Sequence, residues 1–280
     1  MIDCIIIGGG PAGLSAGINL KQRGKEALVL SSGESLLAKA EQVDNYLGMP
    51  TMTGREMMDT FASHAVKQGV EIRAAKAANI MPFDGNFMVN ASGDILECKS
   101  IILATGVAKA KPIAGEAELL GRGVSYCATC DGMLYKDRAI AVWGLVPDAA
   151  HEANFLADIG CKVTFIAGKK PEDLSDAISF VKGRAEKIVG DNMVAGVIAD
   201  GQMIAADCVF ILRNALPPDA LLPGLALKDG SVEINEKAQT SIPGVFAAGD
   251  LAGKPLQVAK AVGEGLVAAL SCAEYLDKQA

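Results

Sequence analysis

Short apolar runs alternate with amphipathic stretches along most of the chain. Three isoleucines at 5–7 form a β-branched run suited to a buried parallel strand, and a helical stretch follows them after a glycine turn. Further buried strands are predicted in ALVLS (27–31) and SIILATG (100–106), and a polar loop leads into a helix near Gly54. Strands that alternate with helices in this way predict an α/β fold with a parallel sheet.

The same alternation recurs in the middle of the chain. Strands are predicted in AIAVWG (139–144) and KVTFIA (162–167), with a helix from Asp148 between them and a hairpin around Asp200 and Gly201. This stretch predicts a second Rossmann-like dinucleotide-binding fold, in the form of a degraded copy of the first.

The end of the chain returns to features typical of a nucleotide site. SIPGVFAAGD predicts a strand that ends at Asp250, and the stretch at 255–276 predicts a long helix. Nucleotide-site features therefore stand at both ends of the sequence, with different material between them. We expect one domain built from residues 1–113 and 243–280, with a second domain, 114–242, inserted into it.

The glycine turn after the first strand carries a specific pattern. Gly8, Gly10 and Gly13 match G-x-G-x-x-G, and Pro11 suits the first turn of the helix that follows. Between a strand and a helix, these glycines allow a tight turn and let a pyrophosphate approach the helix N-terminus. The turn therefore predicts a dinucleotide site.

The second strand lacks the acid that usually holds the adenosine ribose of a dinucleotide. Ser31, Ser32 and Glu34 are the polar residues available at its end. The residues alone leave open which of them does this work.

Composition narrows the functional classes. Half of the 280 residues are hydrophobic and 21% are charged, which is typical of a packed globular protein. The net charge of −7 argues against general nucleic-acid binding, which requires a basic surface. No apolar run approaches the roughly 20 residues of a membrane span, and Asp3 stands where a signal peptide would carry basic residues. We expect a cytoplasmic protein that binds neither membrane nor nucleic acid.

Two of the seven cysteines are paired by their spacing. Cys127 and Cys130 lie in SYCATCDG, and Asp131 follows the second of them. A zinc site would need a second pair or two nearby histidines, and a c-type haem would need histidine in place of Asp131. We therefore predict no metal site and a redox-active pair. The other cysteines stand singly among apolar residues and are predicted to be buried: Cys4, Cys98, Cys161, Cys208 and Cys272.

Six motifs, in this order, resemble the low-molecular-weight thioredoxin reductases over nearly the whole chain. They are GGGPAG, DNYLG, LATG, CATCDG, IPGVFAAGD and the pair Gln257–Val258. The resemblance implies FAD bound by the two-segment domain, and it implies a homodimer. The residues that it assigns to the cofactor are Gly8, Gly10, Pro11, Ala12, Gly13, Ser32, Asn45, Thr105, Gly106, Gly249, Asp250, Gln257 and Val258.

The resemblance also implies roles within the FAD site. Asn45 would face the flavin, and Asp250 would face the ribityl chain. Gln257 and Val258 would lie at the N-terminus of the last helix, where the helix dipole favours an anionic reduced flavin. Without the resemblance, the residues alone favour a turn-capping role for Asn45 and a solvated position in a first helical turn for Gln257.

For the cysteine pair, the resemblance implies disulfide exchange with thioredoxin. Cys130 would be the sulfur nearer the flavin and would receive its electrons. Cys127 would then attack the disulfide of thioredoxin, and Cys130 would resolve the mixed disulfide. Asp131 is placed to donate and accept the accompanying protons.

The inserted domain departs from the family pattern at both of its NADPH signals. Gly144 and Ala149 fit the second glycine fingerprint, but Val146 replaces its central glycine and Pro147 follows. A valine side chain occupies space that a pyrophosphate needs, and proline lacks a backbone N–H donor. The next strand is followed by FIAGKKPED, which lacks the arginines that hold a 2′-phosphate. We predict that NADPH is not the electron donor.

An intact FAD site beside a ruined nicotinamide site is similar to the ferredoxin-dependent flavin thioredoxin reductases, as are the stretches GRGVSYCATCD and HEANFLADI. This resemblance implies reduced ferredoxin as the donor. Two alternatives remain. One is a disulfide reductase with an atypical NAD(P)H site or a second flavin in the inserted domain. The other is a flavin-bearing redox sensor that no longer turns over.

A stretch of the inserted domain is slightly basic. Six cations between residues 160 and 190 outnumber four acids: Lys162, Lys169, Lys170, Lys182, Arg184 and Lys187 against Glu172, Asp173, Asp176 and Glu186. This excess fits a docking surface for an acidic ferredoxin and equally fits an ordinary solvated surface.

Overall fold

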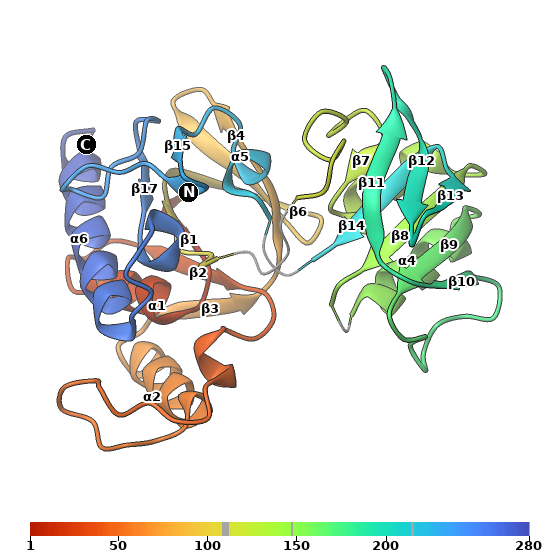
Figure 1. The fold of residues 1–280 in the computed structure, drawn as a ribbon. Coiled ribbons are helices and arrows are strands. Elements are labelled where there is room, and N and C mark those ends of the chain that lie inside the picture. Colours follow the sequence, from red (N-terminus) through yellow and green to blue (C-terminus); the bar gives the residue numbers. More distant parts are fainter. Residues whose placement is uncertain (108–111, 147, 214–215, 280) are drawn as a thin grey trace. The chain divides into compact units, whose positions relative to one another are not determined.

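The computed structural model describes residues 1–107, 112–146, 148–213 and 216–279, and it divides the chain into two compact units (Figure 1). Unit 1 combines Met1–Val107 with Pro218–Ala280, and unit 2 is Ala108–Pro217. Both units contain parallel sheets accompanied by helices, which confirms the predicted α/β class. Within these described ranges, no helix has the length and apolar character needed to cross a bilayer.

The sheet of unit 1 has the strand order β3-β2-β1-β6-β5-β4, with β17 beside β6. The contacts of β1 with β2 and β6 are parallel, as are those of β2 with β3 and of β6 with β17. The strands span Ile2–Ile7 (β1), Ala27–Ser31 (β2), Glu71–Ala74 (β3), Ala77–Phe83 (β4), Asn86–Ala91 (β5), Asp94–Leu103 (β6) and Val245–Ala247 (β17).

Strand β6 serves two parts of this sheet. Its first half pairs with β5 in an antiparallel meander that the sequence analysis did not anticipate, with Phe87 opposite Cys98. Its second half lies parallel to β1 and β17 and ends at Leu103 rather than at Gly106. Likewise, β17 ends at Ala247 rather than at the predicted Asp250, because the chain turns into the 3₁₀ helix η3 (Gly249–Ala252).

The first and last long helices of unit 1 lie side by side (Figure 1). A Cβ on Gly265 would lie 2.2 Å from the carbonyl oxygen of Ala12, so only glycine permits this approach. Ser15 Oγ donates to the carbonyl of Val262 at 2.7 Å across the same interface. The helices of unit 1 are α1 (Pro11–Lys21), α2 (Gly54–Lys67), α5 (Pro218–Leu221) and α6 (Val258–Asp277), with the 3₁₀ helix η1 at Leu37–Lys39.

Residues 218–242 belong with unit 1, so the predicted boundary at 243 is wrong. The segment contains α5, which contacts β4, and the hairpin of β15 (Leu227–Lys228) and β16 (Ser231–Val232), which contacts η3. Ala238 is buried in the core of unit 1. Apolar residues such as Ala238 return the chain to the core of unit 1 before the strand predicted in SIPGVFAAGD begins.

Unit 2 contains a parallel sheet of order β10-β9-β8-β14-β7 and a small antiparallel sheet of β11, β12 and β13. The strands span Val124–Ser125 (β7), Ala139–Gly144 (β8), Lys162–Ala167 (β9), Ser179–Lys182 (β10), Ala185–Gly190 (β11), Val194–Ala199 (β12), Gln202–Ala205 (β13) and Cys208–Leu212 (β14). The helices are α3 (Ala128–Asp131), the 3₁₀ helix η2 (Gly132–Tyr135) and α4 (Ala149–Asp158). The predicted hairpin at Asp200 and Gly201 joins β12 to β13.

A buried charged cluster stands beside the cysteine-containing segment. Glu116 is 0% exposed and accepts hydrogen bonds from Arg213 at 2.9 Å and from the Tyr126 hydroxyl at 2.7 Å. The Arg213 guanidinium lies 5.9 Å from the centroid of the Trp143 ring. Glu116 also accepts from the backbone N–H of Ile113 at 3.0 Å. The Glu116 carboxylate thus bonds to Ile113 near the start of unit 2, to Arg213 directly after β14, and to Tyr126 directly before Cys127.

We expect Glu116→Ala to lower the free energy of unfolding by about 3–5 kcal/mol, because a buried cation loses the carboxylate that balances it. Urea titration followed by the fluorescence of Trp143, the single tryptophan, measures the change. Glu274→Ala is the control, because Glu274 pairs with Lys237 at 3.9 Å on the surface and its loss should change little. Equal effects of the two variants would contradict the assignment of a structural role to the buried cluster.

Candidate active site

Backbone hydrogen bonds hold the carboxyl ends of four neighbouring strands of unit 1 in line. The N–H of Gly8 donates to Leu30 at 2.8 Å, that of Ala104 to Ile7 at 2.8 Å, and that of Ala248 to Leu103 at 2.9 Å. The residues that follow β1, β2, β6 and β17 therefore share one edge of the sheet. In open parallel sheets, ligands bind outside this edge.

The three fingerprint glycines at this edge have different surroundings. Gly8 has a φ of +118°, and a Cβ there would lie 2.3 Å from the carbonyl oxygen of Ala104. A Cβ on Gly13 would lie 1.9 Å from the carbonyl oxygen of Gly8, so glycine permits α1 to pack against the turn. A Cβ on Gly10 would meet only Ser35 Oγ, at 3.7 Å. The turn is tight on two sides and open at Gly10, which fits a pyrophosphate.

The N-terminus of α1 is electrostatically suited to an anion. Gly10 is its N-cap without a side chain to bond the first turn, Pro11 takes the first helical position, and this turn contains no acid. The free N–H groups of Ala12 and Gly13 and the helix dipole would both favour a phosphate here.

The polar residues at the end of β2 differ in their contacts. A Cβ on Gly9 would lie 2.5 Å from Ser31 Oγ, so Ser31 lies against the glycine turn. Ser32 is exposed just beyond the strand, and Glu34 forms an ion pair with Arg55. These contacts favour Ser31 over Glu34 as the residue beside a ribose, with Ser32 next to it.

The second segment of unit 1 places its predicted site residues at the same edge. Gly249 has a φ of +78°, and a Cβ there would lie 3.0 Å from the Cβ of Ala12. The adjoining Asp250 is partly buried, and burial raises the pKa of its carboxyl group. The carboxylate of Glu264 raises this pKa as well, while Lys260 lowers it.

Lys260 and Glu264 hold this turn in place, and the sequence analysis missed both. Lys260 Nζ donates to the carbonyls of Gly249 at 3.0 Å and Gly253 at 2.6 Å, and it pairs with Glu264 at 3.0 Å. Glu264 accepts from the Gly249 N–H at 2.9 Å. Their spacing of four residues on a predicted helix was the only signal available in the sequence.

Asn45 and Gln257 meet although 212 residues separate them. Asn45 Nδ2 donates to Gln257 Oε1 at 3.0 Å. Gln257 is the N-cap of α6, and Val258 is its first residue; the first turn contains no acid. This bond brings the DNYLG loop to the start of the last helix. The remaining predicted residues, Thr105 and Gly106, directly follow Ala104 at the end of β6.

The cysteine-containing segment runs from β7 into the short helix α3 of unit 2. Cys127 is disulfide-bonded, and its carbonyl accepts from the Asp131 N–H at 3.2 Å. The Cys130 side chain lies outside the described part of the structure, so its pairing with Cys127 stays a prediction. Asp131 accepts from Ser125 Oγ at 2.6 Å, and the N–H of Ala128 donates to Glu152 at 3.2 Å. Neither Ser125 nor Glu152 was predicted as a site residue from the sequence, because both contacts depend on tertiary packing.

The five single cysteines are free and buried, which confirms the prediction. Burial raises the thiol pKa of Cys4, Cys161 and Cys208, and it raises that of Cys98 to about 12. A thiol must ionise to react, so burial suppresses the reactivity of these sulfurs.

The turn between β8 and α4 in unit 2 differs chemically from the one in unit 1. Val146, at the place of the central glycine, packs against the hydrophobic core of the unit. Asp148 is the N-cap of α4, and Glu152 adds a second acid in its first turn. Pro147 lies outside the described residues. Two carboxylates at a helix N-terminus take the place of an anionic ligand and repel one.

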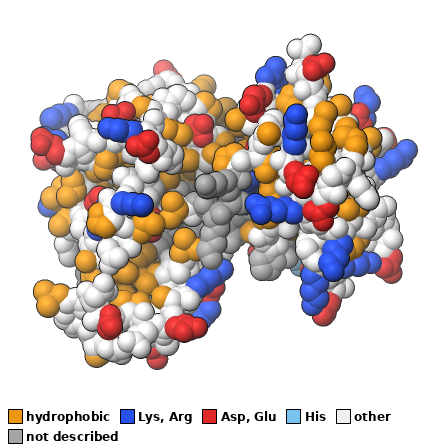
Figure 2. Space-filling view, viewed as in Figure 1, with side chains coloured by type: hydrophobic (Ala, Val, Ile, Leu, Met, Phe, Trp, Pro, Cys, Tyr) orange, Lys and Arg blue, Asp and Glu red, His pale blue; other side chains and the backbone are white. Residues whose placement is uncertain are grey.

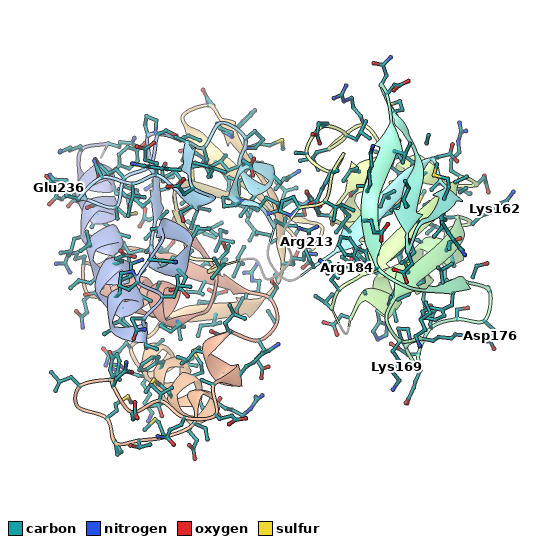
Figure 3. All side chains as sticks on the ribbon, in the orientation of Figure 1. Lys162, Lys169, Asp176, Arg184, Arg213 and Glu236 are labelled. Carbon is teal, nitrogen blue, oxygen red and sulfur yellow. The ribbon has the colours of Figure 1, made fainter. Side chains whose placement is uncertain are left out.

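A pocket of about 600 Å³ nevertheless opens at the carboxyl ends of β8 and β9. Its charged side chains are those of Lys182, Arg184 and Asp200. The backbone N–H of Arg184 donates a hydrogen bond to Asp200 Oδ1 at 3.2 Å. Figure 3 shows Arg184 beside β11, with Lys162, Lys169 and Asp176 on the outer parts of the unit. In Figure 2, acidic and basic side chains are interspersed over this face of unit 2.

Comparisons with known proteins agree with this geometry. The family model of the pyridine nucleotide-disulphide oxidoreductases matches residues 2–265. The thioredoxin reductase of Aquifex aeolicus is 33% identical over 98% of this chain and 93% of its own length. Among solved structures, a ferredoxin-flavin thioredoxin reductase from Clostridium acetobutylicum has a TM-score of 0.90 and 41% identity, covering 99% of this chain and 98% of that one.

A thioredoxin reductase from Gloeobacter violaceus has a TM-score of 0.83 and 31% identity, covering 99% of this chain and 94% of that one. These matches extend over both units and include the glycine turn and the cysteine segment. The chain therefore belongs to the pyridine nucleotide-disulphide oxidoreductase family, as a flavoprotein disulfide reductase of the thioredoxin reductase type.

Proposed function

We propose that this protein reduces thioredoxin with electrons from reduced ferredoxin, by way of FAD and a Cys127–Cys130 disulfide. The observation that carries the proposal is the contrast between the two glycine turns. The turn of unit 1 is open at Gly10 and free of acids, while that of unit 2 has Val146 on the core and Asp148 at the helix start. One dinucleotide site is retained and the other is lost.

The residues of unit 1 fit FAD along its length. The turn at Gly8, Gly10 and Gly13 would hold the pyrophosphate, and Asp250 would hold the ribityl chain. Asn45 and the N-terminus of α6 would face the ring. When bound, FAD can accept electrons singly and deliver them as a pair, which matches a one-electron donor to a two-electron disulfide.

The remaining chemistry belongs to the chain itself. Cys127, as a thiolate, attacks the disulfide of thioredoxin, and Cys130 resolves the mixed disulfide. Asp131 exchanges the protons that the thiols release and consume. A ferredoxin near −400 mV and a thioredoxin near −270 mV differ by about 130 mV, or roughly 6 kcal/mol for two electrons, so the transfer is downhill.

The donor is inferred from two independent supports. The unit 2 turn disfavours a nicotinamide dinucleotide, and the Clostridium acetobutylicum structure of similar fold is described as a ferredoxin-flavin enzyme. For this chain we also infer a homodimer in the cytoplasm, on the family resemblance and on the reducing compartment that five free thiols require.

The unit 2 pocket favours one alternative, a second nucleotide or flavin in the inserted domain. Lys182 and Arg184 could pair with phosphate there. Asp200 on the same wall opposes an anion, and the first turn of α4 beside this pocket carries Asp148 and Glu152, unlike the acid-free turn that would hold the pyrophosphate in unit 1. We therefore favour a single flavin per chain.

Gly10→Val should remove the flavin without unfolding the protein, because the added side chain enters the open side of the turn and meets only Ser35. The absorbance spectrum and protein concentration of the purified variant give its flavin content. Gly168→Val is the control, since a Cβ there meets nothing within 4 Å and lies in the unit 2 pocket. If the Gly168 variant lost its flavin and the Gly10 variant kept it, FAD would be bound in unit 2, and the proposed site in unit 1 would be wrong.

The two cysteines should separate the two half-reactions. In Cys130→Ser the flavin should still be reduced, but no electrons should reach thioredoxin. In Cys127→Ser the remaining thiolate should lie near the flavin and give a long-wavelength charge-transfer band. Anaerobic spectra of both variants check this, and a band seen only in Cys130→Ser would reverse the two roles.

Reduced ferredoxin should bleach the flavin anaerobically and support thioredoxin reduction, and excess NADPH should do neither on the same timescale. The ferredoxin-driven rate should fall as salt is added, because two charged proteins must meet. Stopped-flow absorbance of the holoprotein with each donor measures this. Rapid bleaching by NADPH with ferredoxin inert would contradict the proposal.

A further inference from the structure

The hydroxyl of Ser125 lies between the backbone of Cys127 and the carboxylate of Asp131. It accepts from the Cys127 N–H at 3.2 Å and donates to Asp131 Oδ2 at 2.6 Å. The carbonyl of Cys127 is also 3.4 Å from this oxygen, but a hydroxyl has one proton to donate. The shorter bond, to a carboxylate, is the stronger one. Ser125 thus connects the disulfide segment to the acid in a fixed direction.

Ser125 is held far more firmly than the residue it contacts. It ends β7 and is 3% exposed, opposite the fully buried Phe210 of β14. Asp131 ends α3, a helix of four residues, and is partly exposed. A helix this short does not by itself fix the rotamer of its last side chain. The buried hydroxyl supplies a fixed point on the sheet to which the carboxylate is bonded.

We propose that Ser125 is a positioning residue for proton transfer at Asp131, an inference that rests on the proposed role of Asp131 in thioredoxin reduction. By holding one carboxylate oxygen, Ser125 leaves the other to exchange a proton with the reacting sulfurs.

The proton and electron balance shows where this matters. Before exchange, the reduced protein carries a proton on Asp131, a thiolate on Cys127 and a thiol on Cys130. The thiolate breaks the thioredoxin disulfide and forms a mixed disulfide, and the leaving sulfur takes the proton of Asp131. Asp131 then takes the proton of Cys130, whose sulfur displaces the second thioredoxin sulfur from Cys127. That sulfur receives the proton from Asp131, so two electrons and two protons end on thioredoxin.

Two effects of Ser125→Ala follow from this role. The maximal rate of thioredoxin reduction should fall by about tenfold, because a hydrogen bond to a charged group is lost. The loss should also depend on the Asp131 carboxylate, so Ser125→Ala should cost nothing further once Asp131 is replaced by asparagine. A purely structural role would lower the rate in both backgrounds.

The test uses holoprotein reduced beforehand with dithionite, so that it is independent of the natural donor. Rapid mixing with oxidised thioredoxin, with thiol formation as the readout, compares Ser125→Ala, Ser125→Thr, Asp131→Asn and the double variant Ser125→Ala/Asp131→Asn. We expect threonine, which keeps the hydroxyl, to restore most of the rate. We expect the alanine substitution to add nothing in the Asp131→Asn background.

Ser100→Ala is the matched control, since Ser100 is a buried serine of unit 1 that bonds the Asp3 carbonyl and Cys272. Failure of Ser125→Thr to restore the rate, or an equal further loss from Ser125→Ala in the Asp131→Asn background, would overturn the proposal. The same series with 2-hydroxyethyl disulfide in place of thioredoxin tests the role of Ser125 separately from the identity of the protein partner. Wild-type protein that reduces this small disulfide but not thioredoxin would reject the proposed partner, while the Ser125 comparison would still be decided.

Discussion

The line of backbone hydrogen bonds across the carboxyl ends of β2, β1, β6 and β17 is the constraint on which unit 1 depends. β17 comes from the second segment of unit 1, which is separated from the first segment by the whole of unit 2, and the bonds from Gly8, Ala104 and Ala248 bring the ends of the four strands into register. The glycine turn, Thr105 and the Gly249 turn share one edge for this reason alone. The close packing of α6 against α1, which Gly265 permits, also holds the two segments of unit 1 together.

The same strand-turn-helix geometry has opposite electrostatic character in the two units. In unit 1 the first turn of α1 leaves its N–H groups and its partial positive charge for a ligand. In unit 2 the corresponding charge is already balanced by Asp148 and by Glu152, which also bonds the segment beside Cys127. Fold alone therefore does not decide which cofactor a Rossmann-like unit accepts.

Local patterns predicted the parallel strands β1, β2, β8 and β9 and the two strand–turn–helix connections, because each depends on adjacent residues. Strand 27–31 and the hairpin at Asp200 were found within their bounds for this reason. The boundary at 218, the bond between Asn45 and Gln257, and the contact of Ser125 with Asp131 depend on tertiary packing. Lys260 and Glu264 read in sequence as an ordinary surface pair, and only the position of the Gly249 turn shows what they hold.

The burial of five thiols limits unwanted disulfide exchange within this protein. A protein that continually opens and closes a disulfide would lose electrons to any second accessible sulfur, through mixed disulfides formed within its own chain or with other proteins. Cys4, Cys98, Cys161, Cys208 and Cys272 are withdrawn from solvent. The apolar cores of both units therefore keep these five sulfurs from competing with the disulfide-bonded Cys127 for exchange with other proteins.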